Sequence, residues 1–166
     1  MIKLVIFDVD GVLTDGAIVL DYAGGEQKNF NVQDGTGINY LQRGGIRVAF
    51  LTGRRSPVVV FRAHELGVED VIQGAKDKLA PYAKLLEKRG LHDDEVCYVG
   101  DDLPDVPVMR RVGLPIAVAD ARPEVIELAK YVTRAPGGKG AAREVAEKIL
   151  KEQGLWETII ARYYQK

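Results

Sequence analysis

Short apolar runs alternate along the chain with longer segments of helical periodicity. The first run covers residues 4–7, and its unbroken apolar character is typical of a strand buried on both faces. Comparable runs lie at residues 46–51, 70–72, 95–99, 114–119 and, shorter, 131–132. Between them, apolar residues recur with the spacing of an amphipathic helix, as over residues 79–86. The alternation predicts an α/β fold with a doubly wound, Rossmann-like parallel sheet.

Residue types at the ends of these segments predict where several helices begin and end. Asp34 is expected to cap a helix that closes at Gly44 and Gly45, and Ser56-Pro57 is expected to open the next one. A last amphipathic helix, marked by Trp156, is expected in a helical tail over about residues 155–166. The 166 residues fit one domain, residues 1–166, with a core of ordinary size.

One segment does not fit a plain alternation of strands and helices. Residues 17–22 and 26–32 both have strand character and flank a Gly24-Gly25 turn, which predicts a β-hairpin inserted over about residues 17–32. Its apolar side chains need a surface to cover, and another subunit is one candidate. An ordinary hairpin at the edge of the molecule is the other interpretation.

Composition and charge exclude some classes of function. The net charge of −1 indicates no broad attraction to nucleic acid or to anionic membranes. Cys97 is the single cysteine, so no disulfide can form within the chain, and its apolar surroundings predict a buried thiol. We find no signal peptide and no run long enough to cross a bilayer. We therefore expect a cytoplasmic protein.

Polar residues gather where the predicted strands end. Asp8 and Asp10 follow the first strand, Thr52 follows the second, Lys78 comes soon after the third, and Asp101 with Asp102 follows the fourth. In a doubly wound sheet, ligands bind outside the carboxyl ends of the strands. The convergence predicts a functional site at that edge, although each residue taken singly also has a structural interpretation, such as helix capping by Asp102.

These residue types suit phosphoryl transfer. Asp8 can attack phosphorus as a nucleophile and form an aspartyl-phosphate, and Asp10 can serve as general acid and then as general base. Two adjacent carboxylates repel each other unless a cation lies between them, so we expect Mg²⁺ at Asp8, Asp10 and Asp101. Thr52 can donate a hydrogen bond to a phosphoryl oxygen, and Lys78 can neutralise developing charge. A non-hydrolytic phospho-receiver domain is an alternative, although its phosphorylated aspartate usually follows the third strand.

Four short motifs, in order, resemble those of the haloacid dehalogenase superfamily. They are Asp8-Val9-Asp10-Gly11-Val12, Thr52, Lys78, and Gly100-Asp101-Asp102 with Asp105. Since no segment is long enough for a cap domain, the resemblance is to the capless subclass. It implies that Asp8 is the nucleophile, that Asp10 is the acid/base and also contacts Mg²⁺ through its backbone carbonyl, and that Asp101 is a metal ligand.

Further segments resemble one family within that subclass, the 3-deoxy-D-manno-octulosonate 8-phosphate phosphatases of lipopolysaccharide core biosynthesis. The segments are Asn31 to Gly35, Leu51 to Arg54, Gln73-Gly74, Gly100 to Leu103, Val118 to Ala121 and Gly137 to Gly140. The resemblance implies a phosphoric monoester hydrolase that acts on a small acidic sugar phosphate and assembles as a homotetramer.

The residues expected to contact substrate also follow from this resemblance. They are Asp10, Asn31, Val32, Gln33, Asp34, Gly35, Gly53, Arg54, Arg62 and Lys78. Arginine suits a sugar-acid carboxylate because its planar fork can bind both oxygens. Asn39 stands where some members of the family have arginine, so a nonulosonate 9-phosphate phosphatase or a broader sugar-phosphate phosphatase stays open as an alternative.

Overall fold

The computed structural model describes residues 1–165 and is built around a six-stranded sheet. The strands are β1 (Leu4–Phe7), β4 (Arg47–Leu51), β5 (Asp70–Ile72), β6 (Val96–Gly100), β7 (Leu114–Ala117) and β8 (Tyr131–Val132). They lie in the order β5-β4-β1-β6-β7-β8, and each neighbouring pair is parallel. The predicted doubly wound sheet is therefore confirmed.

Strand β1 occupies the middle of the sheet because its side chains are apolar on both faces. Ile6 aligns with Ala49 of β4 on one side and with Tyr98 of β6 on the other. All four residues of β1 are fully buried. Strands β4 and β5 follow β1 on one side of it, and β6, β7 and β8 lie on the other side. Such a change in strand order opens a crevice at the carboxyl ends of the strands.

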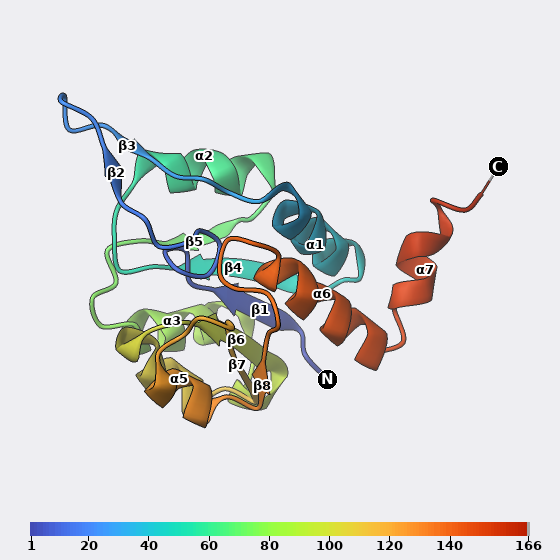
Figure 1. Cartoon of the computed structure of the whole chain (residues 1–166). Helices are drawn as coiled ribbons and strands as arrows, with labels where there is room; N and C mark the ends of the chain where they lie inside the picture. Colours follow the sequence, from blue (N-terminus) through green and yellow to red (C-terminus); the bar gives the residue numbers. More distant parts are fainter. Residues whose placement is uncertain (166) are drawn as a thin grey trace.

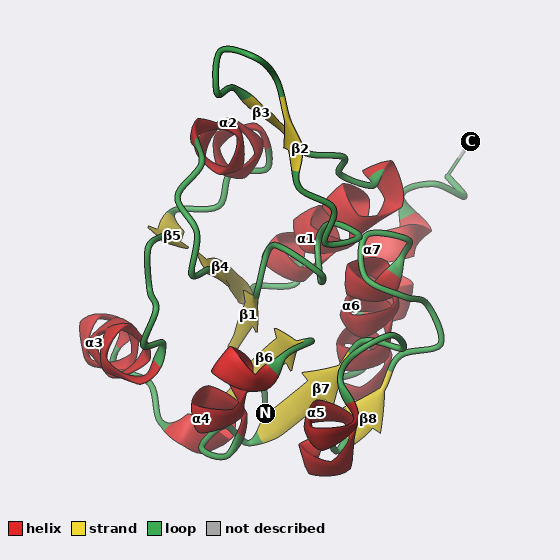
Figure 2. Cartoon of the chain, turned by 60° about the vertical axis from the view of Figure 1, so that its left-hand side comes forward, coloured by secondary structure: helices red, strands yellow, loops and turns green. Residues whose placement is uncertain are grey.

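Helices cover both faces of the sheet (Figure 2). They are α1 (Val32–Arg43), α2 (Pro57–Glu65), α3 (Leu79–Arg89), α4 (Val106–Met109), α5 (Pro123–Leu128), α6 (Ala141–Glu152) and α7 (Trp156–Ala161), with short 3₁₀ turns η1 (Asp93–Glu95) and η2 (Leu103–Asp105). Helices α1, α2 and α6 lie on one face, and α3, α4 and α5 lie on the other. Helices α1 and α6 approach closely at Gly37, where a Cβ would lie 2.9 Å from the Cα of Arg143.

The start of α1 corrects one sequence prediction. Asn31, not Asp34, is the N-cap: its side chain accepts hydrogen bonds from the backbone N–H groups of Gln33 and Asp34 at 2.8 and 3.1 Å. Asp34 lies inside the first turn and is buried. Its carboxylate instead accepts a 3.0 Å hydrogen bond from the backbone N–H of Arg143 at the start of α6. The capping signal was present, but the helix begins earlier because Asn31 provides a cap of equal quality.

A small hairpin projects beside α2 at the carboxyl-terminal edge of the sheet (Figure 1). Its strands, β2 (Val19–Leu20) and β3 (Glu26–Gln27), are antiparallel. Apolar side chains on and around it are exposed, among them Leu20 and Tyr22. Between β1 and α1 the described chain holds only this hairpin and its flanking turns, so no cap domain is inserted there.

The last described helix packs against the body of the molecule. Trp156 of α7 meets Tyr40 of α1 edge to face, with ring centroids 5.9 Å apart, and Ile159 is buried. The expected helical tail extends to residue 166, which lies outside the described residues. Within residues 1–165, none of the helices is long and apolar enough to span a membrane.

Replacing the α1 cap should weaken the fold measurably. Asn31→Ala removes two hydrogen bonds to backbone N–H groups, and we expect the free energy of unfolding to fall by about 1 kcal/mol. Urea denaturation measures this change. The matched control is Asn29→Ala, which removes an exposed asparagine just before the helix and should change stability by less than about 0.5 kcal/mol. Equal effects of the two changes would contradict the assignment of the cap.

Candidate active site

The loop after β1 carries Asp8 and Asp10 in a tight turn. The backbone N–H of Val9 donates to Asp8 Oδ1 over 2.7 Å, and the Thr14 hydroxyl accepts from the backbone N–H of Gly11 at 3.3 Å. Gly11 has a φ of +88°, and a Cβ there would lie 2.0 Å from Asp101 Oδ2. A residue without a side chain is therefore needed for the β1 loop to approach the loop after β6.

A cavity of about 290 Å³ opens at the carboxyl ends of β1, β4 and β6. Its lining contains the residues expected to perform catalysis and to bind metal, together with four of the expected substrate contacts, two of which, Asp10 and Lys78, are also catalytic. The lining residues are Asp8, Asp10, Thr52, Gly53, Arg54, Lys78, Asp101, Asp102, Pro104 and Asp105. The sheet thus brings together side chains that are far apart in the sequence.

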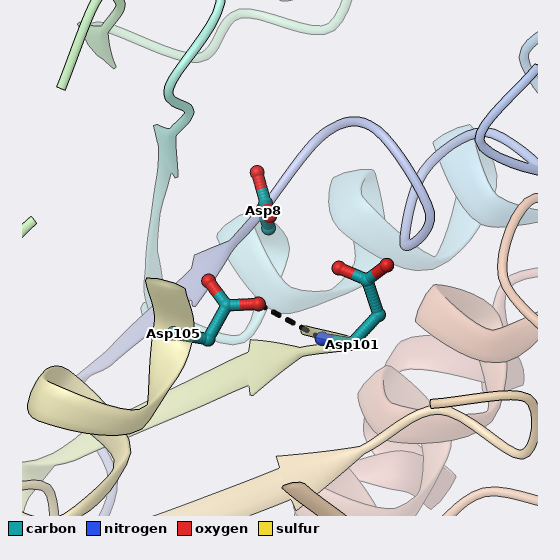
Figure 3. Close-up of side chains that lie close together, drawn as sticks. All are labelled: Asp8, Asp101 and Asp105. Carbon is teal, nitrogen blue, oxygen red and sulfur yellow. Dashed lines mark hydrogen bonds between the residues drawn. The ribbon is translucent and has the colours of Figure 1, made fainter. Parts of the chain in front are cut away.

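Three carboxylates converge in this cavity (Figure 3). Asp8, Asp101 and Asp105 each have an oxygen within 4.8 Å of the others. Burial and the neighbouring carboxylate of Asp105 raise the pKa of Asp8 to about 7. Burial, followed by the charges of Asp8 and Asp105, raises the pKa of Asp101 to about 8. A divalent cation at this point would relieve the repulsion, and oxygen ligands suit Mg²⁺.

Asp105 differs from the other two carboxylates because donors surround both of its oxygens. Its Oδ1 accepts from Lys78 Nζ at 2.6 Å and from the Tyr98 hydroxyl at 2.5 Å. Its Oδ2 accepts from the backbone N–H groups of Asp101 and Asp102 at 2.9 and 3.2 Å. Asp105 therefore organises the loop after β6, and Asp8 and Asp101 are the carboxylates better able to bind a cation.

Lys78 is a buried cation that joins two of these carboxylates. Its Nζ lies 2.8 Å from Asp8 Oδ2 and 2.6 Å from Asp105 Oδ1, and its side chain is 2% exposed. Burial alone would lower the pKa of Lys78, but the charges of Asp8 and Asp105 raise it above its usual value. Lys78 therefore stays protonated beside Asp8, where it can meet an incoming anion.

Asp10 faces a different set of partners from Asp8. Its carboxylate bonds to Lys28 and lies 3.9 Å from Arg54 Nε, whereas the three-carboxylate cluster does not include it. Thr52 is buried where β4 ends, with its backbone N–H bonded to the carbonyl of Ile72 at 2.9 Å. Asp10 and the acidic cluster thus line the same cavity but have different partners.

The substrate contacts expected near α1 lie beside this cavity, not in its lining. Asn31, Asp34, Gly35 and Arg62 surround a separate, smaller hollow, while Val32 and Gln33 are exposed on the first turn of α1. Arg62 Nη2 donates to the backbone carbonyl of Asn31 at 3.3 Å. The expected substrate residues therefore form an inner group in the cavity and an outer group near α1.

Three residues of the site are not predicted from the sequence, and a fourth has no predicted role. Lys28, Glu26 and Tyr98 carried no signal, because a charged hairpin residue and a tyrosine in an apolar strand are both commonplace. Asp105 belongs to the fourth motif, and its spacing of four residues from Asp101 is the sequence signal that places it beside the site. Asp102 caps the 3₁₀ turn η2, as its structural interpretation predicts: its side chain accepts from the backbone N–H of Leu103 at 2.7 Å.

The fold and this constellation define a hydrolase of the haloacid dehalogenase type. The chain matches the family described as haloacid dehalogenase-like hydrolase over residues 60–145, and it belongs to that family. Among curated proteins it is similar to 3-deoxy-D-manno-octulosonate 8-phosphate phosphatase KdsC of Escherichia coli (strain K12). The two are 50% identical over 153 residues, which cover 92% of this chain and 81% of the relative. The resemblance inferred from the motifs is confirmed.

Solved structures agree with this assignment. A crystal structure of 3-deoxy-D-manno-octulosonate 8-phosphate phosphatase from Yersinia pestis matches with a TM-score of 0.93 and 49% identity, covering 94% of this chain and 84% of that one. The enzyme of the same name from Moraxella catarrhalis, solved with a magnesium ion, a phosphate ion and a KDO molecule, matches with a TM-score of 0.95 and 43% identity, covering 98% and 93%.

Magnesium should stabilise the folded protein, and more so in alkaline than in acidic buffer. In the metal-free protein Asp8 and Asp101 hold protons below their raised pKa values of about 7 and 8, and a cation must displace those protons. We expect Mg²⁺ at about 100 times its Kd to add about 2.7 kcal/mol near pH 8.5. At the same Mg²⁺ concentration, this gain in stability, followed as a rise in Tm, should be smaller at about pH 6, because protons compete with the cation and raise its Kd.

Two neighbouring aspartates provide matched variants for this experiment. Asp101→Asn removes a carboxylate of the cluster and should abolish most of the rise in Tm on adding Mg²⁺. Asp102→Asn changes a helix cap and should leave that rise intact. The same magnesium effect in both variants, or one that grows toward acidic pH, would contradict the site.

Proposed function

We propose that this chain is a Mg²⁺-dependent phosphatase that hydrolyses 3-deoxy-D-manno-octulosonate 8-phosphate to the free sugar acid and phosphate. One observation carries the proposal: Asp8 lies between a buried cation, Lys78, and a second carboxylate, Asp101, in a cavity at the switch point of the sheet. Relatives of the chain named for this reaction support the choice of substrate.

The reaction proceeds in two displacements at phosphorus. Asp8 attacks the phosphoryl group, a bond forms between its carboxylate oxygen and phosphorus, and the bond from phosphorus to the sugar oxygen breaks. Asp10 donates its proton to that departing oxygen. Asp10 then takes a proton from water, which attacks the aspartyl-phosphate and releases phosphate from Asp8. Both side chains end in their starting states.

The remaining polar groups of the cavity support these steps. Asp8, Asp101 and the backbone carbonyl of Asp10 would hold Mg²⁺, which when bound offsets the repulsion between the phosphate and the carboxylates. Lys78, fixed 2.8 Å from Asp8, contacts a phosphoryl oxygen and balances its charge. The Thr52 hydroxyl donates a hydrogen bond to a second phosphoryl oxygen. Asp105 and Tyr98 keep Lys78 in place and do not contact the substrate.

The sugar part of the substrate extends from the cavity toward α1. Gly53 and Arg54 line the cavity, and the Arg54 guanidinium binds the sugar-acid carboxylate. The outer contacts are Asn31, Val32, Gln33, Asp34, Gly35 and Arg62. Among these, Val32 and Gln33 present exposed side chains, whereas the carboxylate of Asp34 is engaged with the start of α6.

We also propose that residues 1–166 form a single domain that works in the cytoplasm as a homotetramer. Exposed apolar side chains on the hairpin and on α2, such as Leu20, Tyr22 and Phe61, lie on neighbouring elements (Figures 1 and 2). Contact between subunits would remove this surface from water.

The phospho-receiver alternative fits the site less well. In such domains the phosphorylated aspartate usually follows the third strand. Here Gln73 and Gly74 follow β5, and the carboxylates are grouped after β1 and β6. An acid/base residue such as Asp10 also favours turnover over storage of a phosphoryl group.

Removing the nucleophile should abolish turnover without unfolding the protein. We expect Asp8→Asn to reduce phosphate release to the level of a blank without enzyme, because an amide is a poor nucleophile at phosphorus. Circular dichroism checks the fold, and Asp94→Asn, at an exposed aspartate far from the cavity, should keep full activity. Retained turnover in Asp8→Asn would contradict the mechanism.

Metal dependence and substrate choice are tested with the unaltered chain. EDTA should stop phosphate release, and added Mg²⁺ should restore it. Across a panel of sugar-acid phosphates, kcat/KM should be highest for the eight-carbon acid. A higher value for a nonulosonate 9-phosphate, or equal weak values throughout, would contradict the named substrate and leave the phosphatase activity in place.

A further inference from the structure

Two charged residues at the base of the hairpin, Lys28 and Glu26, have no part in the mechanism above. Lys28 Nζ lies 2.5 Å from Asp10 Oδ1 and 3.1 Å from Glu26 Oε1. The same Glu26 oxygen accepts from Arg54 Nη2 at 2.9 Å. Lys28, Glu26, Asp10 and Arg54 therefore form one network, which we call the hairpin network.

Lys28 is buried to a degree that its location does not explain. Its side chain is 1% exposed, although the hairpin around it is largely exposed. Lysine is almost never fully buried unless it is paired, and both of its partners here are carboxylates. The exposed ion pairs elsewhere on the molecule contribute little to the stability of the fold. An ion pair that is removed from water, by contrast, holds its two side chains in one geometry.

The hairpin has little structure of its own to hold Lys28 in place. Its ladder aligns only Val19 with Gln27 and Leu20 with Glu26, and a two-stranded ribbon is marginally stable at best in water. The bonds of the hairpin network tie β3 to the β1 loop through Asp10 and to the loop after β4 through Arg54. The position of the hairpin and the orientation of Asp10 are thus linked.

The direction in which Asp10 points matches the chemistry required of it. In a displacement at phosphorus, the departing oxygen lies roughly opposite the attacking one. Asp8, the attacking group, belongs to the acidic cluster, whereas the Asp10 carboxylate lies outside that cluster, is bonded to Lys28 and lies 3.9 Å from Arg54 Nε. A carboxyl group on this side can reach the departing sugar oxygen.

We propose that Lys28 is a positioning residue that holds the Asp10 carboxyl group on the leaving-group side of the cavity. This inference rests on the proposed function. The proton passes from Asp10 to the sugar oxygen as the bond from phosphorus to that oxygen breaks and the bond from Asp8 to phosphorus forms. Lys28 donates a hydrogen bond to Asp10 Oδ1 and gives up no proton. The proton that passes to the sugar oxygen is carried on Asp10 Oδ2, and Lys28 acts only by fixing the donor.

Leaving groups of different basicity distinguish this role from simple anchoring of the hairpin. A sugar alkoxide needs a proton as it departs, whereas p-nitrophenolate departs without one. We expect Lys28→Met to lower kcat/KM for 3-deoxy-D-manno-octulosonate 8-phosphate at least about tenfold more than kcat/KM for p-nitrophenyl phosphate, since general acid catalysis contributes about 10²–10⁴-fold. Lys28→Arg, which keeps the cation, should restore most of the ratio.

Three controls make the result decisive. Lys88→Met removes another ion-paired lysine. Lys88 is bonded to Asp70, the first residue of β5, at the end of the strand away from the cavity, so this change should leave the ratio unchanged. In the Asp10→Asn background, Lys28→Met should alter the ratio no further, because the two residues act as one unit. If circular dichroism shows that Lys28→Met does not fold, Lys28→Gln replaces it.

An equal loss on both substrates, or no loss on either, would overturn the positioning role. A further change of the ratio in the Asp10→Asn background would also overturn it. By contrast, absence of phosphate release by the unaltered chain from either substrate would contradict the proposed function itself, so the two failures are distinguishable.

Discussion

Repulsion among buried carboxylates is the constraint around which the site is organised. Asp8, Asp101 and Asp105 converge within 4.8 Å, and burial together with their mutual charge raises the pKa values of Asp8 and Asp101. Lys78 offsets part of this repulsion by bonding to Asp8 and Asp105, and Tyr98 completes the set of donors around Asp105. The repulsion that Lys78 does not offset favours binding of a divalent cation. A divalent cation would also allow a phosphate anion to approach the carboxylate of Asp8.

Close packing between distant parts of the chain maintains this arrangement. Gly11 lies against Asp101, and Gly137, in the loop before α6, lies against Gly11, where a Cβ would come within 1.8 Å of the Gly11 carbonyl oxygen. Figure 1 shows this late loop beside the loop after β1. The Asp120 carboxylate accepts from the backbone N–H of Gly137 at 2.9 Å. The loops that carry Asp8 and Asp101 are therefore held by backbone segments packed so closely that they leave no room for side chains at Gly11 and Gly137.

The sequence was informative where a signal is local and periodic. Apolar runs such as residues 4–7 predicted the sheet, and because parallel strands end at one edge, the positions of Asp8, Thr52 and Asp101 predicted the cavity. Sequence could not show that Asn31 caps α1 in place of Asp34, because both residue types cap helices well. It also could not find Lys28 or Tyr98, whose importance arises from contacts between distant segments.

The most direct test of this account is rapid-quench mass spectrometry of the protein during turnover of 3-deoxy-D-manno-octulosonate 8-phosphate with Mg²⁺. We expect one transient phosphoryl group on the peptide that contains Asp8, which forms and decays fast enough to account for the steady release of phosphate. Phosphate release without any labelling of that peptide would contradict Asp8 as the nucleophile. A label that persists without phosphate release would instead favour the phospho-receiver interpretation.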